Sequence, residues 1–150
     1  MVLAGVVSSI FPPIDPATST SDMEIRVRFA ETDLMGIVHH ASYLLYFEAG
    51  RVEWLRDRGV TYADWAARGV HLPVVEVNLV YKSPAKFDDV ITVETSLVEL
   101  RSVSLKYAYT VKRGDQLLAS GSTRLACIDE KHKLLRIPEP MRDVLLAPPT

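Results

Sequence analysis

The chain has 150 residues, of which 48% are hydrophobic and 24% are charged, and its formal net charge at pH 7 is -2. A chain of this size is expected to form one stable domain, and its charge excludes a globally basic surface for nucleic acid or anionic membranes. The single cysteine, Cys127, excludes an internal disulfide and a cysteine-based metal cluster, so a reducing, cytoplasmic compartment is the simplest interpretation. No apolar run approaches the roughly 20 residues of a membrane-spanning helix, so no membrane insertion is expected.

Residues 1–22 are expected to be an N-terminal extension and linker ahead of a single domain at residues 23–150. The first eleven residues are apolar, but they lack a basic start and prolines follow at once, which argues against a secretory signal peptide. Proline, serine and threonine dominate residues 11–21, as is typical of a linker. We therefore expect the domain to fold and function without residues 1–22.

A strand is predicted at residues 24–30, because apolar and charged side chains alternate there. After a polar turn, a long helix is predicted over residues 42–58, with Ser42 as the candidate N-cap and Gly59 at its end. One glycine inside this helix, Gly50, costs about 1 kcal/mol relative to alanine, so a close approach of sheet backbone is expected there. The face that should pack on the sheet is formed by Tyr43, Tyr46, Phe47, Gly50 and Trp54.

A short second helix is predicted to begin at a capping box, residues 61–64, and to end at Gly69. Strand-like runs then follow in direct succession at 75–82, 91–97, 103–111 and 117–128. Gly121 is a candidate bulge or bend in the last run, and residues 113–115 are predicted to form a hairpin turn. A final short helix is expected near Pro140.

The order of elements is strand, long helix, short helix, four strands and short helix. Strands in succession with hairpin-length links favour antiparallel pairing. The fold class is therefore predicted to be α+β, with one long helix packed against a curved, five-stranded antiparallel sheet and no second domain.

The most informative segment is residues 31–43, Glu-Thr-Asp-Leu-Met-Gly-Ile-Val-His-His-Ala-Ser-Tyr. It places the carboxylate of Asp33 between a strand and the start of a helix, so the carboxylate and helix N-terminal N–H groups should converge on one small volume. Such a carboxylate can attack or deprotonate, and the N–H groups can polarise a carbonyl. An isolated aspartate more often caps a turn through its own backbone, but the whole motif favours catalysis.

The pattern D-x-x-G-[IV]-V-x-H-[AS]-x-Y, from Asp33 to Tyr43, strongly resembles the active-site segment of hotdog-fold acyl-CoA thioesterases of the YbgC/4-hydroxybenzoyl-CoA thioesterase-like branch. A second matching stretch, residues 74–93, contains Tyr-Lys-Ser-Pro-Ala. The resemblance implies a hotdog fold, in which a curved sheet wraps the long helix. It also implies hydrolysis of an acyl-CoA thioester to free acid and CoA without a cofactor, in a homodimer or homotetramer with its sites at the subunit interface.

The resemblance further implies roles for individual residues. Asp33 would be the nucleophile or general base, and backbone N–H groups of His40 and Ala41 would polarise the thioester carbonyl. The His40 side chain would be a further active-site group. The weaker candidates for binding substrate are Tyr43, Glu48, Lys82 and Ser83. Their structural alternatives are core packing for the tyrosine, an ion pair with Arg51 for the glutamate and a solvated strand end for the lysine.

Two positions depart from the resembling branch. Phe29 stands where a tyrosine with an active-site hydroxyl is often found, and it is expected to continue the apolar face of the first strand. His39 stands where tyrosine or phenylalanine is common, and no role is assigned to it. The spacing of acids and histidines around Asp33 fits no familiar zinc motif, so no metal site is expected, and Cys127 is expected to be an inert core residue.

Two other functions stay open from the sequence. One is a hotdog hydratase or dehydratase acting on enoyl thioesters, whose Asn-Pro or Pro-Gly signatures are missing here. The other is a non-catalytic acyl-CoA- or protein-binding module, which Phe29 slightly favours and Asp33 disfavours. Release of thiol from acyl-CoA would separate these from a thioesterase.

Overall fold

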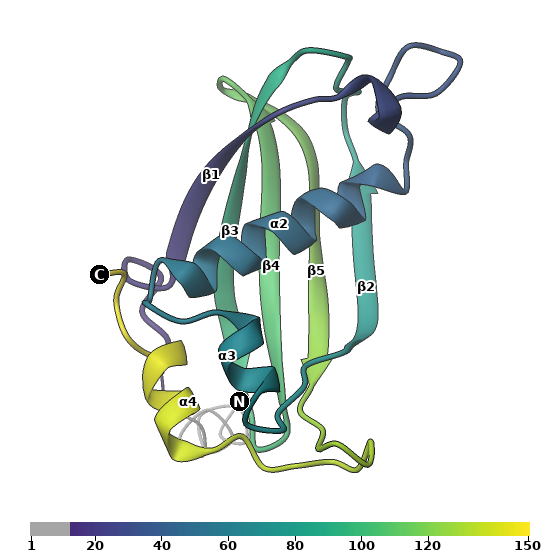
Figure 1. Cartoon of the computed structure of the whole chain (residues 1–150). Helices are drawn as coiled ribbons and strands as arrows, with labels where there is room; N and C mark the ends of the chain where they lie inside the picture. Colours follow the sequence, from purple (N-terminus) through teal and green to yellow (C-terminus); the bar gives the residue numbers. More distant parts are fainter. Residues whose placement is uncertain (1–12) are drawn as a thin grey trace, which may run out of the picture.

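The computed structural model describes residues 13–150, and Figure 1 shows the arrangement of this part of the chain. Within it, five strands form one antiparallel sheet in the spatial order β1-β3-β4-β5-β2. The strands are β1 (Thr20–Arg26), β2 (Val74–Tyr81), β3 (Val90–Leu100), β4 (Ser104–Arg113) and β5 (Gln116–Ala126). The predicted α+β class with a five-stranded antiparallel sheet is therefore confirmed.

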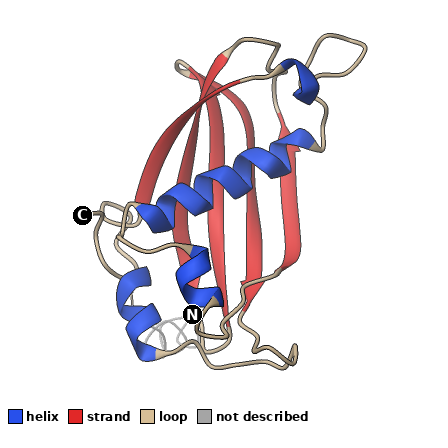
Figure 2. Ribbon diagram, viewed as in Figure 1, coloured by secondary structure: helices blue, strands red, loops and turns tan. Residues whose placement is uncertain are grey.

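The long helix α2 (Ser42–Arg56) crosses one face of the curved sheet, as Figures 1 and 2 show. The Phe47 ring stacks on Tyr109 of β4, and Trp54 meets Tyr107 edge to face. Burial of each such aromatic side chain stabilises the fold by about 1.5–3 kcal/mol. All five residues of the predicted helix face are buried, so the helical period identified the core-facing side correctly.

Two glycines allow close packing between α2 and the sheet. A Cβ atom at Gly50 would collide with Thr95 Oγ1 of β3, so the close neighbour is a side chain and not the expected sheet backbone. A Cβ atom at Gly121 would collide with the carbonyl of Asn78 and with the Phe47 ring. The pairing of β5 continues in register through Gly121, so of the bulge or bend predicted at this position the bulge is wrong.

The first strand lies earlier in the chain than predicted. It ends at Arg26, and the last two residues of the predicted strand, Phe29 and Ala30, belong to the 3-10 turn η1 (Phe29–Glu31). Phe29 is 76% exposed and contacts Phe87 edge to face at 5.7 Å between ring centroids. The expectation that Phe29 continues the buried face of the strand is therefore wrong, because a capping box between Arg28 and Glu31 ends the extended backbone.

The segment directly before β1 contacts the domain. The indole of Trp54 donates a 2.7 Å hydrogen bond to the Ser19 carbonyl, and the Arg58 guanidinium donates to the Thr18 carbonyl. β1 itself begins at Thr20, three residues before the expected start of the domain at residue 23. The linker prediction is thus wrong for this part of the chain, and its portion at residues 1–12 lies outside the described residues.

The remaining elements agree closely with the sequence. The short helix α3 (Tyr62–Ala66) has the predicted capping box at Thr61, and α4 (Glu139–Leu145) has Pro140 in its first turn. The hairpin between β4 and β5 turns at Gly114, and Cys127 belongs to the core. None of the helices at residues 13–150 has the length and apolar character required to span a membrane.

Candidate active site

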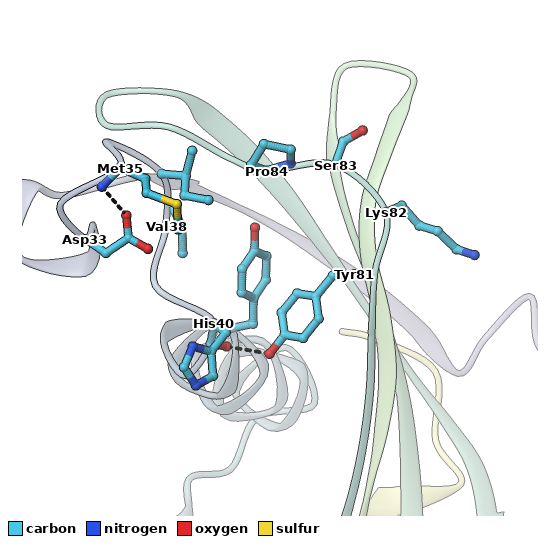
Figure 3. Close-up of a pocket in the computed structure, with 10 residues that line it drawn as sticks. Asp33, Met35, Val38, His40, Tyr81, Lys82, Ser83 and Pro84 are labelled. Carbon is cyan, nitrogen blue, oxygen red and sulfur yellow. Dashed lines mark hydrogen bonds between the residues drawn. The ribbon is translucent and has the colours of Figure 1, made fainter.

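Asp33 opens a tight turn that ends at Ile37. The Asp33 N–H donates to the Ile37 carbonyl at 2.9 Å, and the Gly36 N–H donates to the Asp33 carbonyl at 3.0 Å. Gly36 has a φ of +78°, a backbone conformation that glycine adopts without steric cost. The Met35 N–H donates to Asp33 Oδ1 at 2.8 Å, drawn as a dashed line in Figure 3. Asp33 therefore caps the turn with Oδ1, while Oδ2 has no hydrogen-bond partner within residues 13–150.

The entry to α2 is arranged by His39, a residue to which the sequence assigned no role. Its Nδ1 accepts a 3.1 Å hydrogen bond from the Ala41 N–H, and its carbonyl accepts one from the Ser42 N–H at 2.9 Å. The helix N-cap is Ala41 and not the predicted Ser42, whose hydroxyl instead donates to the Glu31 carbonyl. His39 Nδ1 must be unprotonated to accept this bond, which places the ring proton of the neutral imidazole on Nε2.

These contacts distinguish the two predicted carbonyl-polarising groups. The Ala41 N–H is used by His39, whereas the His40 N–H has no acceptor in the described part of the chain. Of these two N–H groups, only that of His40 is therefore free to bind a ligand carbonyl in this arrangement. The two imidazoles lie against each other, with ring centroids 4.2 Å apart.

A pocket of about 310 Å³ lies between this segment and the end of β2. It brings together five of the residues predicted from the sequence, and Figure 3 shows that they come from the turn, the start of α2 and the segment after β2. Apolar side chains form much of the remaining wall. The predicted residues in the wall are Asp33, His40, Tyr43, Lys82 and Ser83, and the others are Met35, Ile37, Val38, Tyr81 and Pro84.

Tyr43 is a core residue that also lines the pocket. Its side chain is buried in the core, its hydroxyl accepts a 3.3 Å hydrogen bond from the Ala85 N–H, and its ring contacts Tyr81 edge to face. Burial raises the pKa of the Tyr43 hydroxyl, so this group is neutral at physiological pH. Tyr43 thus joins the hydrophobic core to the wall of the pocket.

The structure does not bring Glu48 together with the other predicted site residues. Glu48 Oε2 lies 3.9 Å from Arg51 Nη2, which is the i,i+3 ion pair considered as its alternative. Both side chains line a separate pocket of about 220 Å³ beside β2, together with Leu44 and Leu45. Glu48 is therefore removed from the set of residues that surround Asp33.

Sequence reasoning also missed Tyr81 as a site residue. Its hydroxyl donates a 2.7 Å hydrogen bond to the His40 carbonyl, which links the end of β2 to the start of α2. The available signal was its place in the second stretch that resembles the thioesterase branch. Lys82, the next residue, is exposed and forms no ion pair among residues 13–150. Clusters of three or more His, Cys, Asp or Glu suited to a metal ion do not occur in that range.

Comparisons with known proteins identify the family of the chain. Residues 27–147 match the family model described as the thioesterase-like superfamily. The chain is 36% identical over 112 residues to the putative acyl-CoA thioesterase YneP of Bacillus subtilis strain 168, covering 74% of this chain and 81% of that protein. It is 29% identical over 106 residues to the acyl-CoA thioester hydrolase YbgC of Escherichia coli O6:H1, covering 70% and 79%.

A solved structure supports the same relationship. The crystal structure of hypothetical protein TT1821 from Thermus thermophilus matches with a TM-score of 0.80 and 45% sequence identity, covering 84% of this chain and 95% of that one. The predicted hotdog fold and the predicted family are confirmed by these matches. The chain belongs to the thioesterase-like superfamily.

Proposed function

We propose that this chain is an acyl-CoA thioesterase in which Asp33 is the nucleophile or general base and the His40 N–H polarises the thioester carbonyl. The observation that carries the proposal is the pocket that Asp33 and His40 share, in which Asp33 Oδ2 and the His40 N–H have no hydrogen-bond partner among residues 13–150. The names given to the YneP and YbgC relatives, an acyl-CoA thioesterase and an acyl-CoA thioester hydrolase, support the same reaction.

The geometry suits the chemistry of a thioester. When an Asp33-activated water attacks the carbonyl carbon, the C–S bond breaks, the thiolate of CoA leaves and the free acid is formed directly. When Asp33 itself attacks, the thiolate leaves an acyl–aspartyl anhydride, which water then hydrolyses to the free acid and the Asp33 carboxylate. Negative charge develops on the carbonyl oxygen, and a fixed N–H donor at the start of a helix stabilises it. Because a thiolate is a good leaving group, no strong general acid is required. The His40 imidazole can hydrogen bond to the acid or the water.

The pocket walls fit the two ends of such a substrate. Met35, Ile37 and Val38 provide an apolar surface for the acyl group. Lys82 lies at the pocket and is exposed, so its ammonium can bind phosphate groups of CoA. In this proposal the acyl group lies against the Asp33 turn and the CoA portion lies beside the segment that follows β2.

We further propose that the protein functions in the cytoplasm as a homodimer or a dimer of dimers. β2 is at one edge of the sheet, and most of its side chains are exposed, including Val75, Val77 and Val80. The neighbouring Leu44 and Leu45 on α2 are exposed as well. An apolar sheet edge of this kind favours pairing with a second copy of the chain. The second copy would also cover the exposed surface of β2 and α2 beside the pocket.

The test is release of free thiol from a panel of acyl-CoAs by the wild type and two aspartate variants. Asp33→Asn is expected to lower turnover at least about a hundredfold, the loss expected for a positioned acid–base group. Asp129 is a matched control because its Oδ1 also caps a turn, by accepting from the Lys131 and Lys133 N–H groups away from the pocket. Asp129→Asn should keep normal turnover. Binding of acyl-CoA without thiol release would instead identify a binding module.

A further inference from the structure

Glu31 is a buried carboxylate two residues before Asp33, and it is not part of the pocket wall. Its side chain is 5% exposed. Oε1 accepts hydrogen bonds from the Arg28 N–H at 2.9 Å and the Tyr46 hydroxyl at 3.0 Å, and Oε2 accepts from Arg28 Nε at 2.6 Å. Burial raises the pKa of Glu31, but these donors outweigh burial and the net pKa is lowered, so the group is ionised at neutral pH.

The backbone of Glu31 holds the segment that contains His40. Its carbonyl accepts a 2.8 Å hydrogen bond from the His39 N–H and a 3.1 Å bond from the Ser42 hydroxyl. These two donors come from either side of His40 and Ala41. The position of the Glu31 carbonyl therefore determines where the His40 N–H lies.

The side chain of Glu31 in turn fixes its own backbone from two directions. Arg28 closes the 3-10 turn on one side through a capping box. Tyr46 reaches Glu31 from α2, one helical turn after Ser42, so the carboxylate is bonded to the same helix whose entry the carbonyl holds. The carboxylate, the carbonyl and the first turn of α2 thus form one closed set of hydrogen bonds around the free N–H of His40.

We propose that Glu31 is a positioning residue for the thioesterase reaction, holding the His39–Ser42 backbone so that the His40 N–H points at the reacting carbonyl. The inference rests on the proposed function of Asp33 and His40. A charged group is costly to bury unless it is hydrogen bonded. The hydrogen bonds of Glu31 connect it to the segment from His39 to Ser42 and to α2. A displaced donor stabilises the transition state less, even where substrate binding is unchanged.

The experiment compares Glu31→Gln with a matched structural control, Arg58→Gln. Arg58 is also buried and charged, and it donates to the Thr18 carbonyl before β1 and to the Ala147 carbonyl after α4. Both variants should lower the melting temperature of the full chain. Glu31→Gln should also lower kcat at least about tenfold with KM within about twofold, since a lost oxyanion donor costs on the order of 10²–10³ and a displaced one less. Arg58→Gln should leave kcat unchanged.

A second measurement does not depend on activity. Hydrogen exchange of the ¹⁵N-labelled full chain should show faster exchange of the His39 amide in Glu31→Gln, and wild-type exchange there in Arg58→Gln. If the wild type hydrolyses no acyl-CoA, the proposed function fails while this measurement still tests the positioning of the segment. If Glu31→Gln does not fold, Tyr46→Phe removes only the bond from α2 and should lower kcat about fivefold. Wild-type kcat and His39 exchange in a folded Glu31→Gln or Tyr46→Phe variant would overturn the proposal.

Discussion

The hydroxyl of Tyr81 donates a 2.7 Å hydrogen bond to the carbonyl oxygen of His40. This bond joins two segments 41 residues apart, the end of the edge strand β2 and the entry to α2. It acts on the peptide unit that follows His40, on the opposite side of the residue from the free N–H. The pocket, the sheet edge and the segment from Asp33 to His40 therefore meet at one contact.

We expect Tyr81→Phe to lower kcat/KM about fivefold, because one neutral hydrogen bond that holds the His40 peptide is lost while the aromatic wall remains. Tyr81 is the last residue of β2 and is half exposed, so the melting temperature should change by only a few degrees. Steady-state thiol release and thermal melting check both parts. An unchanged kcat/KM would show that the bond has no part in positioning His40.

The ionised Glu31 should make stability depend on pH in a defined direction. Hydrogen bonds from Arg28 and Tyr46 outweigh burial and lower its folded-state pKa below the ordinary value of 4.5. Its contribution is therefore fully present above that ordinary value and is lost as the pH falls through the lower folded-state pKa. The difference in unfolding free energy between wild type and Glu31→Gln should be constant above about pH 5 and shrink below about pH 4. Denaturant unfolding at a series of pH values measures it, and a difference that grows in acid would contradict the ion-pair assignment.

Deletion of residues 1–22 is now expected to destabilise the protein, against the expectation from composition. The deletion removes the first three residues of β1 and the Ser19 carbonyl, which accepts from the Trp54 indole and the Leu97 N–H. Loss of acceptors from buried donors costs about 1–3 kcal/mol each. A deletion of residues 1–12 is the comparison, because it keeps every contact named here. Equal melting temperatures for the two truncations would show that residues 13–22 are dispensable.

A structural feature could be predicted from the sequence when the interactions that produce it are between residues close together in the chain. The buried face of α2 follows from the spacing of its own residues, and the α3 capping box follows from Thr61 and Asp64. Phe29 continues the alternation of the strand in sequence, yet the bonds of Glu31 to Arg28 turn the chain before it. The alternation of apolar and charged residues, with its period of two, does not show that the Glu31 carboxylate bonds Arg28, three residues before it, and ends the extended backbone.

The site shows the same division between local and distant causes. Asp33 and His40 are seven residues apart in one recognisable motif, and the pocket contains both. The cap formed by His39 depends on backbone geometry that no pattern of residue types records. The Tyr46 hydroxyl reaches Glu31 from α2, and the Tyr81 hydroxyl reaches His40 from β2, so neither hydrogen bond could be found without the fold.

The exposed edge strand leads to a prediction about assembly. Val77 of β2 is 45% exposed and lines the small pocket beside Leu44 and Leu45. If a second copy covers this edge, Val77→Lys should convert the dimer to a monomer, because an unpaired charge would be buried at the interface. Val98 of β3, 48% exposed, is the matched control, and Val98→Lys should leave the dimer intact. Light scattering at micromolar concentration distinguishes the outcomes, and a wild type that is already monomeric and fully active would refute the dimer.

His40 has two groups that can act in the proposed reaction, its imidazole and its backbone N–H. His40→Ala removes the imidazole but keeps the backbone N–H, which has no acceptor among residues 13–150 and remains available to the thioester carbonyl. Turnover should therefore fall about tenfold, less than the hundredfold or more expected for Asp33→Asn. His39→Ala should have a different signature, because loss of Nδ1 releases the Ala41 N–H and loosens the start of α2. That variant should lower both stability and kcat, whereas His40→Ala should lower kcat alone. Thiol-release kinetics and thermal melting of the three variants test this assignment. If His40→Ala is as inactive as Asp33→Asn, the imidazole, and not the N–H, is the principal contribution of His40.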